Sequence, residues 1–238
     1  MSVDEALEAL RDGSFVLVYD AVSRENETDL VILAEKVEPH HVAQMRMDAG
    51  GLICVALHPR IASNLGLPYM TEVYGAAANK FEVLAATEPN DIPYDERSAF
   101  SISVNHRKTY TGITDTDRAL TIRETGVLGE KAMVKRVVSE FGKNFRSPGH
   151  VPLLRAAEGT VLKRQGHTEL ACALAEMAGA TPVLAICEML DSQTSKALSR
   201  RAAVRYAGER ALTHLDGVEI VDEYKKWMKH REGQKCAK

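Results

Sequence analysis

The sequence predicts an α+β fold, a single domain in which a mixed β-sheet is flanked by helices in three layers. Short β-branched runs alternate with helical patterns along the 238 residues, and this alternation favours helices packed on a sheet. The apolar runs 15–19 and 30–34 are joined by about ten residues, too few for a crossover helix, so we expect an antiparallel hairpin and hence a mixed sheet. No repeat, low-complexity linker or break in composition divides the chain.

Each element follows from a local pattern. Strands are expected in apolar or alternating runs, at 15–19, 30–34, 52–57, 99–106, 181–190 and 218–221. Helices are expected where apolar residues recur at helical spacing, at 3–13, 39–51, 58–67, 115–126, 168–180, 195–212 and 223–238. Pro39 starts one helix, and Gly13 and Gly126 each end another. Residues 69–95 have few periodic signals and predict a long loop, whereas 143–156 are irregular and then extended. We expect the domain to span 1–222, followed by a short helix and basic tail at 223–238.

Composition excludes several classes of protein. The chain is 45% hydrophobic and 26% charged with a net charge of -3, so no excess of positive charge favours nucleic acid or an acidic membrane. No secretory signal and no spanning apolar run is expected. Cys54, Cys172 and Cys187 lie in apolar segments, Cys236 lies in the tail, and none forms a C-x-x-C pair. We therefore expect a cytoplasmic protein with reduced thiols, which binds neither nucleic acid nor membrane.

The stretch RENETD, residues 24–29, places four charges between two strands that belong in the core. Arg24, Glu25, Glu27 and Asp29 would lie at the turn of the predicted hairpin. Such a turn is often only a solvated loop. The density of carboxylates also suits a hard cation such as Mg²⁺, which takes one or two carboxylates and keeps several waters.

A second constellation, KRQGHTELACALAEMAG, covers residues 163–179. Gly166 and His167 stand before the expected helix, and Thr168 is at or near its N-cap. A helix start attracts phosphate, and Arg164 could add a bidentate contact. His167 could bind a metal or move a proton. The alternative is an ordinary capped helix with a surface histidine.

Three further residues are candidates with competing explanations. His150 follows the Pro-Gly turn of RSPGHVPLLRA, where a histidine is more often structural. Glu188 ends an apolar strand, so it either pairs with an arginine or has a pKa perturbed for chemistry. A helix cap at Thr114 or Asp115 would leave Thr111 free to contact a ligand.

Together these strings resemble the 3,4-dihydroxy-2-butanone 4-phosphate synthase family of riboflavin biosynthesis. RENETDL, DAGGLICVAL, TGITDTDRA, RSPGHVPLLRA and GHTELACALAEMAG followed by CE occur in the family's order, from about residue 13 to 222. The resemblance implies a magnesium-dependent lyase, with manganese as an alternative ion. This lyase converts D-ribulose 5-phosphate to L-3,4-dihydroxy-2-butanone 4-phosphate and formate. It also implies a homodimer with sites near the subunit interface, and a chain without the fused GTP cyclohydrolase II domain of some relatives.

The resemblance also implies roles for individual residues. The metal ligands would be Glu25 and His167. The catalytic residues would be His150, Glu188 and Asp29. The residues around the substrate would be Arg24, Glu25, Asp29, Thr111, Arg164, Gln165, Gly166, His167, Thr168 and Glu188. Cys54 matches a position that lines the site. Thr28 departs from the family, since many relatives have glycine there, and a β-branched residue restricts the loop.

The chemistry fits these assignments, because enediol formation, water loss and formate release all require proton transfer. We hypothesise that Asp29 and Glu188 move protons with help from His150, and that the loop holding Glu25 is a lid over metal and sugar. Another magnesium-dependent enzyme of pentose phosphates, such as an isomerase or epimerase, would need a similar site. A nucleotide- or RNA-binding module would instead use the basic helix at 196–210.

Overall fold

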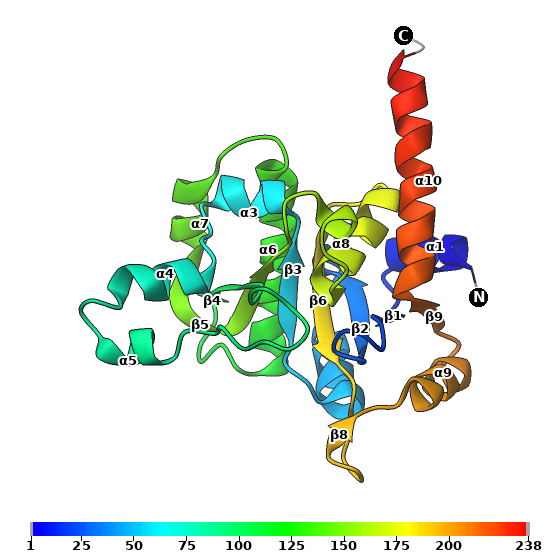
Figure 1. Ribbon diagram of the computed structural model, residues 1–238, viewed down its shortest axis with the longest axis horizontal. Helices are drawn as coiled ribbons and strands as arrows, with labels where there is room; N and C mark the ends of the chain where they lie inside the picture. The colour runs from blue at the N-terminus through cyan, green and yellow to red at the C-terminus, as the bar shows by residue number, and fades with distance from the viewer. Residues whose placement is uncertain (1, 237–238) are drawn as a thin grey trace.

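The computed structural model describes residues 2–236 and contains a seven-stranded mixed sheet (Figure 1). Its strand order is β4-β5-β3-β6-β2-β1-β9, with β3 parallel to β5, β1 parallel to β9 and the remaining neighbours antiparallel. The strands are β1 (Val16–Tyr19), β2 (Thr28–Leu33), β3 (Cys54–Leu57), β4 (Phe100–His106), β5 (Phe145–Arg155), β6 (Val183–Glu188) and β9 (Thr213–Asp216). A separate two-stranded ribbon joins β7 (Leu190–Asp191) to β8 (Lys196–Ala197). The predicted hairpin of β1 and β2 and the mixed sheet are confirmed.

Helices cover both faces of this sheet. One face carries α2 (Pro39–Gln44), α3 (Pro59–Leu65), α6 (Asp115–Ala132), α7 (Val138–Asn144) and α9 (Arg200–Glu209). The other face carries α1 (Val3–Arg11), α8 (His167–Met177) and α10 (Gly217–Cys236). Short helical turns lie at η1 (Ala34–Lys36), η2 (Met45–Ala49) and η3 (Thr160–Leu162). The predicted three-layer arrangement is therefore confirmed.

Alternation along the central strands builds the two cores. In β2, Leu30 and Ile32 pack toward the α6 layer, whereas Val31 and Leu33 pack toward the α8 layer. All four side chains are buried, because the strand has helices on both sides. The same alternation places Asp29 on the α8 face of the sheet, where the candidate site lies.

Two predicted element boundaries are wrong. Gly126 does not end α6, which continues to Ala132. A Cβ at Gly126 would lie 2.6 Å from the backbone nitrogen of Glu35, so this glycine lets the helix approach η1 closely. The run 218–221 is not a strand but the first turn of α10, and the last strand is β9 just before it. Ile220, Val221 and Tyr224 are buried at helical spacing. The four residues 218–221, VEIV, were too short a run to show this spacing, and their β-branched side chains favoured a strand.

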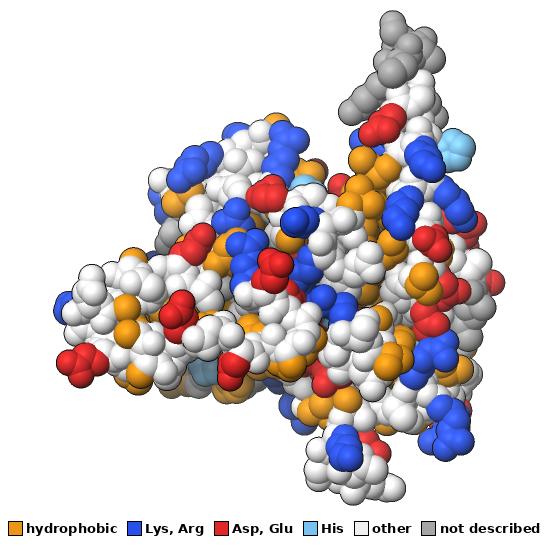
Figure 2. All heavy atoms as spheres, in the orientation of Figure 1, with side chains coloured by type: hydrophobic (Ala, Val, Ile, Leu, Met, Phe, Trp, Pro, Cys, Tyr) orange, Lys and Arg blue, Asp and Glu red, His pale blue; other side chains and the backbone are white. Residues whose placement is uncertain are grey.

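Residues 69–95 are not simply a loop, because they contain α4 (Met70–Ala77) and α5 (Glu82–Ala86). No side chain within these two described helices is buried, so neither helix has the apolar stripe by which a helix is recognised in sequence. They form an extension at one side of the molecule (Figure 1), with hydrophobic side chains showing among few charges on its surface (Figure 2). Helix α7 was not predicted, and 145–155 form one long strand with register shifts against β4.

Two further sequence expectations concern the whole chain. Within residues 2–236 no helix is both long and apolar enough to cross a membrane. Cys54, Cys172 and Cys187 are buried free thiols, as expected, and the side chain of Cys236 lies outside the described part of the chain. Helix α10 runs without interruption past residue 222.

Candidate active site

The loop between β1 and β2, residues 20–27, is held in place from within. The buried carboxylate of Asp20 accepts hydrogen bonds from the backbone N–H groups of Glu25 and Glu27, at 2.9 and 3.1 Å. The Tyr19 hydroxyl donates to Asn26 Oδ1 at 2.6 Å, and Asn26 takes a left-handed φ of 58° that an asparagine tolerates. These contacts favour a fixed loop over the mobile lid that we hypothesised. Thr28 lies outside this loop as the first residue of β2, where a β-branched side chain is favourable.

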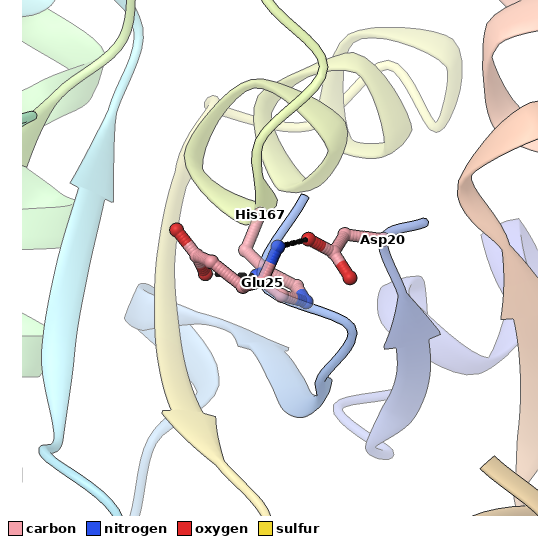
Figure 3. Close-up of side chains that lie close together, drawn as sticks. All are labelled: Asp20, Glu25 and His167. Carbon is pink, nitrogen blue, oxygen red and sulfur yellow. Dashed lines mark hydrogen bonds and ion pairs between the residues drawn. The ribbon is translucent and has the colours of Figure 1, made fainter. Parts of the chain in front are cut away.

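His167 is the first residue of α8, and Gly166 is its N-cap, one to two residues earlier than predicted. His167 Nδ1 lies 3.1 Å from Glu25 Oε2 (Figure 3). Its Nε2 lies 3.2 Å from the backbone carbonyl oxygen of Glu27. A carbonyl only accepts, so Nε2 carries a hydrogen and Nδ1 is the atom that faces Glu25. Burial disfavours the charged ring, but Asp29, Glu25 and Asp20 outweigh burial and raise the pKa of His167 to about 10.

Asp29 and Glu188 are directly opposite each other on neighbouring strands β2 and β6. Asp29 is 1% exposed, and its Oδ1 has no hydrogen-bond partner among the described residues. Burial raises the pKa of Asp29 well above its usual value; His167 opposes this, and the nearby carboxylate of Glu188 adds to it. Glu188 is oriented by the backbone N–H of Leu52, which donates to its Oε2 at 2.7 Å.

Two predicted arginines meet a residue that the sequence analysis did not select: Arg164, expected at the phosphate, and Arg24, expected to contact the substrate. Arg24 Nη2 donates to Asp95 Oδ2 at 2.9 Å, and Arg164 Nε donates to the same oxygen at 2.7 Å. Arg164 Nη1 also pairs with the buried Glu169, whose other oxygen accepts from the backbone N–H of Ala157 at 2.8 Å. Nothing in the local sequence around Asp95 marks it, because its partners are 69 and 71 residues away.

One cavity on the α8 face brings most of the predicted residues together. Its lining includes the predicted residues Glu25, Asp29, Cys54, Arg164, His167, Thr168 and Glu188. Arg24 and Gln165 line adjoining hollows, and Gly166 lies between Gln165 and His167 as the helix N-cap. Any side chain at Gly166 would collide with the Arg164 guanidinium, since its Cβ would lie 2.3 Å from Arg164 Nη1.

Carboxylate and imidazole donors converge beside this cavity in a form that suits a divalent cation. Ligand atoms of Asp20, Glu25 and His167 lie within 4.8 Å of one another. Asp20 and Glu25 come from the loop between β1 and β2, and His167 comes from the start of α8 (Figure 3). Both Asp20 oxygens already accept backbone hydrogen bonds, so Asp20 acts first to hold the loop. It was not predicted, although an acid directly after the buried run 15–19 was a signal.

His150 and Thr111 do not line this cavity. His150 is exposed on β5, and its backbone N–H donates to Asn105 Oδ1 at 2.8 Å. The N–H groups of Thr111 and Gly112 both donate to Asp117 Oδ2, and the Thr111 hydroxyl makes a long 3.4 Å contact with the same oxygen. The role of Thr111 in contacting a ligand stays a prediction. These residues belong to a separate surface at the β4–β5 edge of the sheet.

Residues 4–223 match the family model described as 3,4-dihydroxy-2-butanone 4-phosphate synthase. The chain belongs to the 3,4-dihydroxy-2-butanone 4-phosphate synthase family. It is accordingly an enzyme with the activity that names the family, in riboflavin biosynthesis. The synthase of Methanothermobacter thermautotrophicus is 52% identical over 93% of this chain and 95% of the relative. The synthase of Archaeoglobus fulgidus is also 52% identical, over 95% of each chain.

Solved structures of the synthase family share the fold. A crystal structure of a 3,4-dihydroxy-2-butanone 4-phosphate synthase in complex with two magnesium ions superposes with a TM-score of 0.77 at 31% identity, covering 95% of this chain and 97% of that one. The cation-free form of a synthase gives a TM-score of 0.75 at 30% identity, over 95% and 98% of the two chains. The α+β architecture with its mixed sheet is therefore that of the synthase family.

Proposed function

We propose that this chain converts D-ribulose 5-phosphate to L-3,4-dihydroxy-2-butanone 4-phosphate and formate in the cavity bounded by Glu25, Asp29, His167 and Glu188. The observation that carries the proposal is the convergence, on one face of the sheet, of a carboxylate–imidazole pair and two further acids. The reaction needs a metal site beside several groups that move protons.

Glu25 and His167 would hold the divalent cation, Mg²⁺ or alternatively Mn²⁺. The fit is supported by Nδ1 and Oε2, which face each other at 3.1 Å, and by Nε2–H, which the Glu27 carbonyl fixes in the way usual for a metal-binding imidazole. The raised pKa of His167 describes the ring without a cation, and a bound cation would take the place of the Nδ1 proton. Asp29 Oδ1 is buried and makes no hydrogen bond within the described residues, and its nearest cationic group is His167 Nε2 at 3.6 Å. This buried carboxylate therefore also favours a cation close by. When bound, the ion would act as a Lewis acid that polarises the substrate ketone.

Asp29 and Glu188 would move the protons. The pKa of Asp29 is raised by burial, which brings this carboxyl closer to the pH at which general acid–base catalysis is effective. Glu188 is its cross-strand neighbour and is held by Leu52. Two adjacent acids in different environments can serve proton transfers at different oxygens of one sugar.

The start of α8 would bind the phosphate group. The first turn of this eleven-residue helix leaves N–H groups without partners in the helix, and Gly166, His167 and Thr168 lie there. Arg24, Arg164 and Gln165 border the same region. This arrangement would hold the sugar phosphate with its ketone end toward Glu25.

His150 and Thr111 would act from a second copy of the chain. Both lie outside the cavity of their own chain. Two hydrophobic side chains beside Thr111, Tyr110 and Ile113, are 94% and 50% exposed, which favours burial against a partner. A homodimer that covers this surface would bring His150 to the other subunit's site. Mixing His150→Gln subunits with Asp29→Asn subunits should then restore part of the activity, because one site of each mixed dimer is complete.

We also expect a cytoplasmic enzyme without nucleic-acid partners. Two arginines on the basic face of α9 are already paired with carboxylates. Arg200 pairs with Asp216, and Arg205 pairs with Glu209 on the helix itself. This pairing supports a solvated surface helix over an RNA-binding surface.

Proton NMR of the purified protein with ribulose 5-phosphate and Mg²⁺ tests the function. Formate should appear, and a chelator should abolish it. Loss of substrate without formate would contradict the proposal and indicate an isomerase or epimerase. An Asp91→Asn variant, altered at an exposed carboxylate, serves as the matched control and should produce formate at the wild-type rate.

A further inference from the structure

Residues 88–98, here called the strap, connect α5 to β4 and pass over the cavity. In Figure 1 this segment runs back in front of the sheet before it enters β4, and Ile92, Tyr94 and Asp95 line the cavity with His167. The strap is anchored where it joins β4. There the guanidinium carbons of Arg97 and Arg155 lie 3.9 and 4.9 Å from the centroid of the Tyr69 ring.

Away from this anchor, Asp95 supplies the strap's ionic contact with the site. One carboxylate oxygen, Oδ2, accepts from Arg24 at 2.9 Å and from Arg164 Nε at 2.7 Å. Arg164 Nη2 is also within ion-pair distance of that oxygen. The Nε–Nη2 edge is one of the two edges of a guanidinium that bind carboxylates and phosphates in a bidentate manner, and the other edge of Arg164 includes Nη1, which pairs with Glu169. Asp95 therefore occupies the edge of Arg164 that a phosphate would need.

Asp95 is not the sole anion beside these arginines. Arg164 is also paired with Glu169, which is fully buried on the inner side. Arg24 Nε lies 4.0 Å from the buried Asp20, but it makes no hydrogen bond within the described residues. Asp95 is therefore the carboxylate that both arginines share, and it comes from a segment that follows two helices without buried side chains.

We propose that Asp95 is a specificity-determining residue that holds the place of the substrate's phosphate group and is displaced by it. The inference rests on the proposed function, in which Arg24 and Arg164 bind that phosphate. A dianion competes for the two arginines better than a single carboxylate, whereas an unphosphorylated sugar has nothing with which to displace Asp95. The strap thereby covers the cavity until a phosphorylated ligand arrives, and Figure 2 shows basic and acidic side chains intermixed on this face of the molecule.

Calorimetric titration of inorganic phosphate into the full chain, without metal or sugar, tests the proposal. Removing the competing anion increases the fraction of open sites, so Asp95→Asn should bind phosphate about tenfold more tightly than wild type. Glu96→Gln is the matched control, since the Glu96 carboxylate is exposed and makes no side-chain hydrogen bond or ion pair within residues 2–236; it should bind phosphate as wild type does. Equal or weaker phosphate binding by Asp95→Asn would overturn the proposal and make Asp95 a structural ion-pair partner.

A second measurement uses the unaltered protein. Hydrogen exchange of backbone amides in residues 90–97 should become faster when phosphate saturates the site, because Asp95 is released. Unchanged exchange with phosphate bound would overturn the proposal even if the Asp95 variant failed to fold. Formate production by wild type is read separately. If the protein makes formate but neither phosphate measurement gives the expected result, the strap mechanism alone is refuted. If both phosphate measurements give the expected result but no formate appears, the proposed function alone is refuted.

Discussion

The loop at 20–27 and the strap at 88–98 border the same cavity, yet they are held in different ways. The loop lies between two buried strands, and Asp20 binds the N–H groups of Glu25 and Glu27 from inside. The strap follows two helices with no buried side chains within the described chain, and Asp95 supplies its ionic contact with the site. Both segments bring carboxylates to cationic groups.

The difference indicates what each segment can do. A residue proposed to bind the metal, such as Glu25, must keep its position to within a fraction of an ångström, and internal hydrogen bonds provide that. A gate needs one contact that a ligand can replace, and the Asp95 ion pairs provide that instead. The fixed side of the cavity should therefore control chemistry and metal binding, whereas the strap should control access.

The largest effect on activity is expected from a change on the fixed side of the cavity, at Asp29. Asp29→Asn should reduce kcat at least about hundredfold, because an amide cannot transfer the proton. The variant should unfold at the same temperature as wild type or higher, since Asp29 is buried without a hydrogen bond to its Oδ1. Formate release at saturating substrate and Mg²⁺ measures the rate, and calorimetry measures the unfolding. Wild-type turnover would show that Asp29 only lines the cavity.

A smaller effect is expected when the loop is loosened. In Asp20→Asn one acceptor oxygen becomes an NH₂ group, so the N–H of Glu25 or Glu27 loses its partner. Metal affinity should fall about 10- to 100-fold, the usual cost of removing a group that orients a ligand. Titration with Mn²⁺ in the absence of substrate measures this affinity. Asp12→Asn, which changes a carboxylate just beyond α1, should leave it unaltered.

The residues on the loop side of the cavity could be selected from the sequence, although the sequence suggested a mobile lid there and not a loop held by Asp20. Glu25, Asp29, His167 and Glu188 lie in short strings next to strongly patterned strands and a helix, so local pattern and family resemblance both selected them. The hairpin that carries Glu25 and Asp29 followed from the length of the connection.

The strap could not be predicted in the same way. The pairing of Asp95 with Arg24 and Arg164 joins residues about 70 positions apart, and no local pattern encodes such a contact. Helices α4 and α5 escaped prediction because they bury no side chain and therefore show no periodicity. Likewise, Gly126 resembled a helix end, although its role is to allow close packing on η1.

A change at the anchor of the strap should have a modest effect on stability. Tyr69→Phe removes the hydroxyl that accepts from Arg97 Nη2 at 3.0 Å and donates to the Ala156 carbonyl oxygen at 3.4 Å, but keeps the ring beside Arg97 and Arg155. The free energy of unfolding should fall by about 1 to 2 kcal/mol, since each hydrogen bond has a net value of about 1 kcal/mol, as measured by urea denaturation. Formate release should stay within about twofold of wild type. Tighter phosphate binding in this variant would place control of the strap at Tyr69 rather than at Asp95.

The smallest expected effect is that of pH on strap closure. Burial opposes ionisation of Asp95, but hydrogen bonds from Arg164 and Arg24 outweigh it and lower its pKa. A lowered pKa in the folded state means that the contact is fully present above the ordinary aspartate value of about 4 and is lost only as pH falls through the lowered value. Between about pH 5 and 8, the protection of amides 90–97 against hydrogen exchange, corrected for intrinsic rates, should therefore stay constant.

A change in that protection within this pH range would require another titrating group. The pKa of Tyr94 is raised and that of Glu25 is lowered, so both move away from the range. Asp29 and Glu27 have raised pKa values and lie on the loop side of the cavity. Repeating the hydrogen-exchange measurement in Asp29→Asn would then show whether Asp29 is the titrating group. If the pH dependence disappeared with Asp29, the strap and the fixed loop would be coupled through the cavity, and the separation between chemistry and access would not hold.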